Sequence, residues 1–470
     1  MDEAFIAFTG QETSFVLDCG IGHRPGVLYW GPRLKNADGR QLKQMGFRQH
    51  APGSADAEVA GSLLNEAGSG FLGPPGFYAH RSGEAWASIL RVDRIERAGA
   101  NEIKLICRDT ATRVAAIHKL ALNPHSDVLT CQTEIVNEGD TDLSIYWCAS
   151  ACLPVDPRMD RLFGFTGRWA GEFHIEEVPM YQGSYVRENR SGRTSHDTFP
   201  GLILAAPGTS EQAGSCYGFH LGWSGNARLR VDRLSDGRSF AQFGAYVFPG
   251  EVTLPPDGVY PTPPLYTAFS PNGRSALSRK FHAHLRQTIL DNRTRSKPRP
   301  VHFNTWEAVY FDHDEDKLFA LATAAAEVGA ERFILDDGWF AGRRNAEAGL
   351  GDWYPDTDVY PNGLSPLIDH VAGLGMEFGL WVEPEMVNPD SELFRAHPDW
   401  ILRVEGVDQI TSRGQYVLDL TQPEVCDHLY GQLHTILSDN PIRYIKWDMN
   451  RDIHHPASHG IPVGHRQTRA

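Results

Sequence analysis

From Pro300 onward, the chain alternates short apolar runs with amphipathic helical segments, and this alternation constrains its fold more than any other feature. Strands that alternate with helices form βα units, whose strands pair in parallel within one sheet. The expected strands are residues 301–306, 332–335, 377–382 and 443–450, and the expected helices are residues 314–328, 364–374 and 424–438. The sequence therefore predicts an α/β domain built on a parallel sheet.

The chain before Leu290 has the pattern of β-structure, because apolar residues alternate with polar ones and turn residues recur between them. Examples of expected strands are residues 85–92, 102–107, 129–136 and 144–148. Many strands with few helical periods predict a large sandwich. A helix is expected over residues 275–290, where apolar residues recur at every fourth position.

A proline-rich segment, Lys297-Pro298-Arg299-Pro300, separates the two patterns. We therefore expect a first domain of residues 1–295 and a second domain of residues 296–470. The formal net charge of -15 argues against a nucleic-acid partner or an anionic membrane surface. No uninterrupted apolar stretch has the length of a membrane span.

Seven cysteines, odd in number and scattered along the chain, favour a reduced, cytoplasmic protein over a disulfide framework. Cys148 and Cys152 are the closest pair, but no nearby residues complete a zinc spacing. The histidine-rich segment 454–459 also lacks the carboxylate or thiol spacing of a metal site, so we interpret it as a loop. We expect no metal and no cofactor.

Polar or aromatic residues stand at the ends of all four expected parallel strands. They are Trp306, Asp336 with Asp337, Trp381, and Lys446 with Asp448. In a parallel barrel these carboxyl ends converge on one mouth, where such folds carry their chemistry. Carboxylates accept hydrogen bonds from hydroxyl groups and an indole covers the apolar face of a pyranose, so the combination suits a sugar.

Each of these residues also has a simpler interpretation when it is taken alone. Asp336-Asp337-Gly338 fits an ordinary turn, and Trp306 and Trp381 fit a buried core. Lys446 and Asp448 fit a surface ion pair on an edge strand. Their joint placement at four strand ends favours a site, in which the Lys446 ammonium would keep the Asp448 carboxylate ionised.

Five segments together resemble the motifs of the α-galactosidases of glycoside hydrolase family 36. They are Trp306, Leu335-Asp336-Asp337-Gly338-Trp339-Phe340, residues 379–387, the residues 413–419 with Arg413, and Lys446-Trp447-Asp448-Met449-Asn450-Arg451. The resemblance covers nearly the whole chain and includes the β-rich first half. It implies an N-terminal β-supersandwich followed by a (β/α)8 barrel.

The resemblance also implies a role for each matching residue. Asp448 corresponds to the catalytic nucleophile, which forms a covalent galactosyl-enzyme intermediate. Asp336 and Asp337 correspond to the pair that binds the hydroxyls at C4 and C6 of galactose. The remaining matches contact the sugar or form aromatic walls around it, and they are Trp306, Trp381, Arg413, Lys446 and Asn450. Glu383 and Glu385 match no catalytic acid of the family, and we interpret both as structural.

One part of the family pattern has no counterpart in this chain. The family's general acid/base is an Asp in a segment after a Ser-Cys-x-Gly-Gly-type motif, and no such motif follows Asp448 before Ala470. We therefore expect a barrel that appears truncated after its fourth strand. We also expect the acid/base residue, the rest of the barrel and the C-terminal β-domain to lie outside this chain.

Three functions remain open on the sequence. The first is a retaining α-galactosidase that removes terminal α-linked galactose from oligosaccharides. The second is an α-N-acetylgalactosaminidase or galactosyl transferase of the same family, and the third is a non-catalytic galactoside-binding fragment. The resemblance also suggests a homo-oligomer, a tetramer, in which the glycine-rich loop of residues 68–76 approaches a neighbour's active site.

Overall fold

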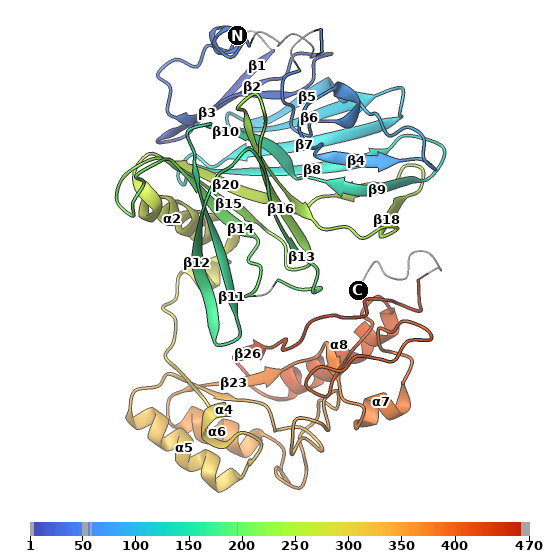
Figure 1. The fold of residues 1–470 in the computed structure, drawn as a ribbon. Coiled ribbons are helices and arrows are strands. Elements are labelled where there is room, and N and C mark those ends of the chain that lie inside the picture. The colour runs from blue at the N-terminus through green and yellow to red at the C-terminus, as the bar shows by residue number, and fades with distance from the viewer. Residues whose placement is uncertain (1–3, 49–54, 57–58, 195, 462–470) are drawn as a thin grey trace. The chain divides into compact units, whose positions relative to one another are not determined.

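The computed structural model describes residues 4–48, 55–56, 59–194 and 196–461. The chain divides into two compact units, Met1–Asn292 and Arg293–Ala470 (Figure 1), and each is described here by itself. The first unit is built almost entirely of antiparallel strands, and the second contains a parallel sheet with helices. A β-rich part followed by an α/β part is the order that the sequence predicts.

The described residues of the first unit form four antiparallel sheets. The largest contains, in spatial order, β12 (Gly171–Pro179), β11 (Arg161–Arg168), β14 (Gly201–Ala205), β15 (Cys216–Leu221), β20 (Leu265–Ser270), β8 (Val128–Asn137), β7 (Val114–Leu122), β6 (Glu102–Asp109) and β5 (Arg91–Gly99), with β19 (Val259–Pro261) paired to β8. A second sheet contains β10 (Ala151–Val155), β17 (Ser239–Ala245), β16 (Ala227–Arg233) and β13 (Gly183–Asn189). The two smaller sheets are β1 (Phe5–Thr9), β2 (Thr13–Asp18) and β3 (Gly26–Pro32), and β18 (Val252–Leu254), β9 (Leu143–Cys148) and β4 (Phe77–His80).

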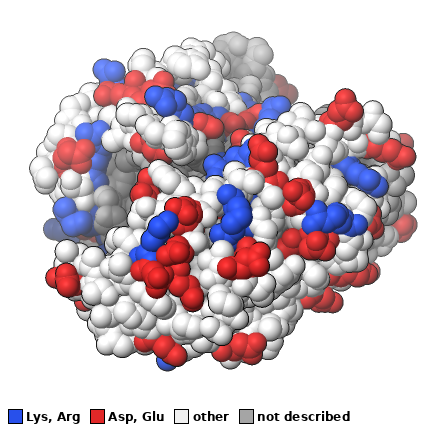
Figure 2. Space-filling model, turned by 90° about the horizontal axis from the view of Figure 1, so that it is seen from below, with Lys and Arg blue, Asp and Glu red and all other residues white. Residues whose placement is uncertain are grey.

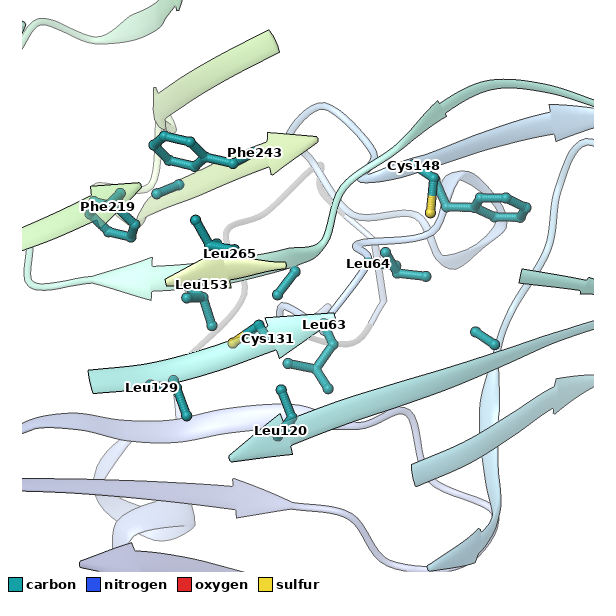
Figure 3. Packing of buried hydrophobic residues seen from close by; sticks show 14 of the residues in the cluster. Leu63, Leu64, Leu120, Leu129, Cys131, Cys148, Leu153, Phe219, Phe243 and Leu265 are labelled. Atoms are coloured by element: carbon teal, nitrogen blue, oxygen red, sulfur yellow. The ribbon is translucent and has the colours of Figure 1, made fainter. Parts of the chain in front are cut away.

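One large apolar core holds these sheets together. Strands of different sheets contribute to it, for example Leu120 and Leu129 from the largest sheet and Leu153 and Phe243 from the second (Figure 3). Alternate residues of β8 are buried, as expected for strands with one face on a core. The apolar alternation visible in the sequence is therefore the pattern that forms this core.

Few helices occur among the described residues of the first unit. They are α1 (Gly39–Met45), the 3-10 turn η1 (Ala67–Ser69), α2 (Gly273–His284) and the π-helical turn η2 (Leu285–Ile289), and α3 (Asn292–Arg295) follows at the boundary. The helix expected over 275–290 is thus confirmed as α2 with η2. The strand expected over 85–92 is wrong, because β5 begins only at Arg91 and Ala85 has φ +55°.

Up to residue 461, where the described part of the second unit ends, its parallel sheet has four strands in chain order, β21 (His302–Asn304), β22 (Arg332–Leu335), β23 (Glu377–Val382) and β26 (Tyr444–Trp447). A separate antiparallel pair is β24 (Met386–Val387) with β25 (Tyr416–Val417). The helices are α4 (Trp306–Val309), α5 (Glu315–Glu327), α6 (Ser365–Gly373), α7 (Glu392–Ala396) and α8 (Pro423–Asp439). The predicted strands 332–335 and 377–382 and the three long predicted helices are confirmed.

Local sequence explains why α5 begins where it does. The Asp314 side chain accepts a hydrogen bond from the Lys317 backbone N–H, and Glu315 and Asp316 occupy the first turn. A carboxylate at this position satisfies a free backbone donor, and acidic residues interact favourably with the helix dipole. The strand expected over 301–306 is shorter than predicted, because Trp306 begins helix α4.

Charged side chains of both signs occur on the described part of the surface. On the face in Figure 2, acidic and basic side chains lie interspersed, and the coloured residues form no broad basic area there. None of the helices among the described residues is both long and apolar enough to cross a membrane.

Candidate active site

Asp336 directly follows β22 and is held from four directions. Its Oδ2 accepts hydrogen bonds from Asn304 Nδ2 at 2.6 Å and from Lys446 Nζ at 2.7 Å. Its backbone N–H donates to Thr305 Oγ1, and its Oδ1 accepts from the Asp337 backbone N–H. Asn304 ends β21 and Lys446 belongs to β26, so three strands of the sheet fix this carboxylate.

Asp337 forms a buried, bidentate ion pair with Arg343. Arg343 Nε and Nη2 donate to Asp337 Oδ1 and Oδ2 at 2.9 and 2.8 Å, and Arg343 Nη1 donates to Asn388 Oδ1 at 2.9 Å. Both charged side chains are almost inaccessible, at 1% and 6% exposure. Burial raises the pKa of Asp337, and the neighbouring Asp336 charge raises it further, while Arg343 and Arg413 oppose the increase.

Asp448 comes directly after β26, and its carboxylate is oriented by donors on both oxygens. Oδ2 accepts from Trp381 Nε1 at 2.9 Å and from Asn450 Nδ2 at 2.8 Å. Oδ1 accepts from the Met449 backbone N–H at 3.0 Å. Trp381 lies on β23, next to β26 in the sheet, so the pairing of these two strands brings the indole to the carboxylate.

The prediction that Lys446 pairs with Asp448 is wrong. Its ammonium pairs with Asp336 at 2.7 Å, and no ion pair joins it to Asp448 among the described residues. Strand β23 lies between β22 and β26, and the long lysine side chain reaches across it. Asp448 is instead held by neutral N–H donors.

The aromatic residues predicted for the sugar subsite have different surroundings. Trp381 is 2% exposed, and its ring is parallel to that of Phe340 at 6.3 Å. Trp306 is half-buried and packs edge-on against Tyr310 and Phe311. Only Trp306 therefore presents part of its ring outward, while Trp381 faces the core and donates its N–H to the site.

Arg413 is exposed and has a left-handed backbone conformation, with φ +57°. Its charge lowers the pKa of Asp337 and of Glu383, partly offsetting their burial. A guanidinium so placed is available to a ligand hydroxyl.

Several residues of this site were not singled out from the sequence as site residues. Asn304 and Thr305 hold Asp336, and Arg343 and Asn388 hold Asp337. The sequence signal for Arg343 is an arginine six residues after a strand that ends in two aspartates. Asn388 offers no comparable signal, because it reaches the site only through the folded chain.

Gly338 requires a conformation and a space that only glycine fits. Its φ is +115°, and a Cβ there would lie 2.9 Å from His313 Nε2. We expect Gly338→Ala to lower the free energy of unfolding by about 1–3 kcal/mol, measured by urea denaturation. The control Gly373→Ala adds a methyl group in open space at the end of α6, and is expected to be neutral or stabilising. Equal stability of Gly338→Ala and the wild type would contradict this account.

His313 lies next to Gly338 in the Asp336-Asp337-Gly338 turn. Its low pKa leads us to expect that the protein loses stability in acid. Burial, aided by the Arg344 charge, lowers its pKa from 6.5 to about 4, and its Nδ1 lies 2.7 Å from Tyr360 Oη. Because the pKa is lower in the folded than in the unfolded protein, protonation of this histidine favours unfolding. The stability that the neutral side chain contributes is therefore present in full above pH 6.5 and is lost as the pH falls toward 4. We therefore expect the loss of unfolding free energy between pH 7 and 4 to be about 3 kcal/mol smaller in His313→Gln than in the wild type.

The control for this measurement is His434→Gln, at an exposed position of α8. Its pH dependence is expected to match that of the wild type. A His313→Gln variant with the same pH dependence as the wild type would show that His313 does not remain neutral in the folded protein.

Comparison with known families and structures gives the context of this geometry. Residues 23–255 match the glycosyl hydrolase family 36 N-terminal domain, and residues 259–470 match the melibiase family. An alpha-galactosidase of Escherichia coli is 41% identical over 445 residues, which are 94% of this chain and 62% of that protein. This chain thus spans less than two thirds of that relative's length.

Solved structures resemble the whole chain. An AgaA variant, a family 36 alpha-galactosidase from Geobacillus stearothermophilus in complex with 1-deoxygalactonojirimycin, has a TM-score of 0.92 at 27% identity, covering 98% of this chain and 68% of that one. A second AgaA variant, in complex with raffinose, has a TM-score of 0.91 at 27% identity, covering 99% and 69%. The two family matches and these structures together account for nearly every residue, and the chain therefore belongs to glycoside hydrolase family 36.

Proposed function

We propose that the protein carrying this chain is a retaining α-galactosidase and that Asp448 is its nucleophile. The observation that carries the proposal is the placement of three carboxylates directly after two strands of the same parallel sheet, β22 and β26. Lys446 on β26 binds Asp336, which follows β22. Asp448 lies two residues after Lys446, directly after β26. The names of the family's relatives support the substrate class.

The hydrogen bonds of Asp448 suggest which oxygen reacts. A carboxylate oxygen has two lone pairs in its plane, and Oδ2 already accepts two N–H groups, from Trp381 and Asn450. Within the described part of the chain, Oδ1 accepts a hydrogen bond from the Met449 N–H alone, which leaves one of its lone pairs free. We assign the attack on the anomeric carbon to Oδ1, because its free lone pair can form the new bond while Oδ2 is held.

The reaction then follows the double displacement of retaining glycosidases. A bond forms between Asp448 Oδ1 and the anomeric carbon as the glycosidic C–O bond breaks, and the leaving oxygen takes a proton from a general acid. Water later cleaves the galactosyl ester and frees the carboxylate. No residue of this chain is assigned as the general acid.

Asp336 and Asp337 would bind the hydroxyls at C4 and C6 of galactose. Further polar contacts to the sugar would come from Arg413, Lys446 and Asn450. Both aspartates are held before any sugar arrives, which reduces the entropy lost on binding. Terminal α-linked galactose in oligosaccharides such as raffinose is the proposed substrate, supported by the raffinose complex of the AgaA variant.

Three further properties belong to this proposal. The four parallel strands in chain order would be the first half of a (β/α)8 barrel, preceded by a β-supersandwich. The seven cysteines are free thiols, and six of them are buried, which supports a reducing, cytoplasmic location. The resemblance to the family supports a homo-oligomer, a tetramer.

The test is hydrolysis of 4-nitrophenyl α-galactoside by the native protein, expressed with whatever coding sequence follows residue 470. An activated leaving group needs little protonation, so this substrate reports mainly on the nucleophile. We expect turnover of the α-galactoside and none of its β-anomer. Faster turnover of the α-N-acetylgalactosaminide would favour that specificity instead, and binding without turnover would favour a galactoside-binding protein.

A further inference from the structure

We propose that Glu383 is a positioning residue for the nucleophile, and that it acts through the side-chain amide of Asn450. This inference rests on the proposed function of Asp448. It gives a function to Glu383, which follows β23 and which the sequence alone led us to interpret as a structural residue.

Glu383 and Asp448 share one amide group between them. Glu383 Oε1 accepts from the Asn450 backbone N–H at 2.7 Å and from Asn450 Nδ2 at 3.0 Å. The same Nδ2 donates to Asp448 Oδ2 at 2.8 Å. The two hydrogens of one NH2 group thus join the two carboxylates.

An amide side chain has a donor end and an acceptor end, and either end fits the same space. An ionised carboxylate only accepts hydrogen bonds, so Glu383 favours the orientation in which Asn450 presents its NH2 group. In the reverse orientation, the amide oxygen would face both carboxylates and Asp448 Oδ2 would lose a donor. Glu383 therefore orients the Asn450 amide so that its NH2 group, and not its oxygen, contacts Asp448 Oδ2.

Burial argues against a direct chemical role for Glu383. The residue is 1% exposed, and its second oxygen, Oε2, accepts from Gln415 Nε2 at 3.2 Å. Three N–H groups thus occupy the carboxylate, which cannot reach a leaving group. Gln415 follows Arg413 by two residues, so the same carboxylate also connects the nucleophile to the segment that carries the exposed guanidinium.

The charges around Glu383 fit this placement. Burial raises its pKa, the Asp448 charge raises it further, and the hydrogen bonds from Asn450 and the Arg413 charge lower it. The Arg451 guanidinium also lies within its electrostatic range. The two cations and the donors of Asn450 thus partly offset the increase in pKa that burial and Asp448 cause.

Glu385 provides a matched control in the same Glu383-Pro384-Glu385 segment. Its Oε1 accepts from Trp447 Nε1 at 2.9 Å, and Trp447 is 57% exposed. Both glutamates are largely buried and both have a raised pKa, with burial as the main cause. They differ in their partner, because Glu385 has no hydrogen bond to Asn450 or Asp448 among the described residues.

The experiment compares Glu383→Met, Glu383→Gln and Glu385→Met in the native protein, with kcat and KM measured for 4-nitrophenyl α-galactoside. Methionine has a similar size but accepts no strong hydrogen bond, so we expect Glu383→Met to lower kcat on the order of 10²-fold with little change in KM. Glutamine keeps one strong acceptor for Asn450, and Glu383→Gln should recover most of the activity. Glu385→Met should retain wild-type kcat.

A double-mutant cycle separates positioning from a general loss of structure. If Glu383 acts through Asn450, adding Glu383→Met to Asn450→Ala should reduce kcat no further than Asn450→Ala alone. Near-wild-type kcat in Glu383→Met, or full additivity in the cycle, would overturn the inference while leaving the proposed function intact. A wild-type protein without turnover would overturn the proposed function, and this inference with it.

Discussion

Asp448→Asn is expected to lower kcat for 4-nitrophenyl α-galactoside by about 10⁴-fold or more, as removal of a covalent nucleophile does in other enzymes. An amide has nearly the same shape as a carboxylate but cannot form the galactosyl ester. The Trp381 and Asn450 donors can still meet the amide oxygen, so the fold around the strand end should remain. The measurement uses the native protein, with its melting temperature as a check on folding.

The control is Asp439→Asn, which makes the same chemical change at an exposed position at the end of α8. This variant should retain the wild-type kcat. Substantial turnover by Asp448→Asn would remove the nucleophile assignment. A galactosyl group trapped covalently on any other residue would do the same.

Arg343→Ala is expected to have the largest effect on stability, a loss of about 3–5 kcal/mol of unfolding free energy. The change leaves the Asp337 carboxylate buried without its bidentate partner, and it also removes the donor to Asn388 Oδ1. Such a charge is expensive to bury without a partner. Urea denaturation at pH 7 measures the effect.

Arg395→Ala is the matched control, because Arg395 pairs with Asp390 and Glu392 at the surface of the same unit. Its removal should leave the unfolding free energy nearly unchanged. Removing both charges in Arg343→Met with Asp337→Asn should recover part of the loss, since no unpaired charge then remains buried. If Arg343→Ala and Arg395→Ala were equally stable, the buried pair would contribute nothing to the fold.

The local elements of the second unit could be predicted from the sequence because their signals are local. The apolar runs of β22 and β23 and the capped start of α5 have the predicted positions. The prediction was wrong where tertiary context overrides local pattern, as at Trp306, which begins a helix, and at residues 85–90, which precede β5. In the second case, an Asp109 oxygen binds the Ile89 backbone N–H in place of a sheet partner.

The sequence by itself determined which polar residues follow which strands, because a residue's place at a strand end depends only on the run of apolar residues that precedes it. It did not determine their partners. Lys446 lies about 7 Å along the strand from Asp448, yet it binds Asp336, whose position in the sequence is more than a hundred residues away. The pairings of Arg343 with Asp337 and of Glu383 with Asn450 likewise depend on how loops and strands pack. Only the tertiary structure decided these contacts, because strand pairing and burial, rather than spacing along the chain, set which charges share a low-dielectric site.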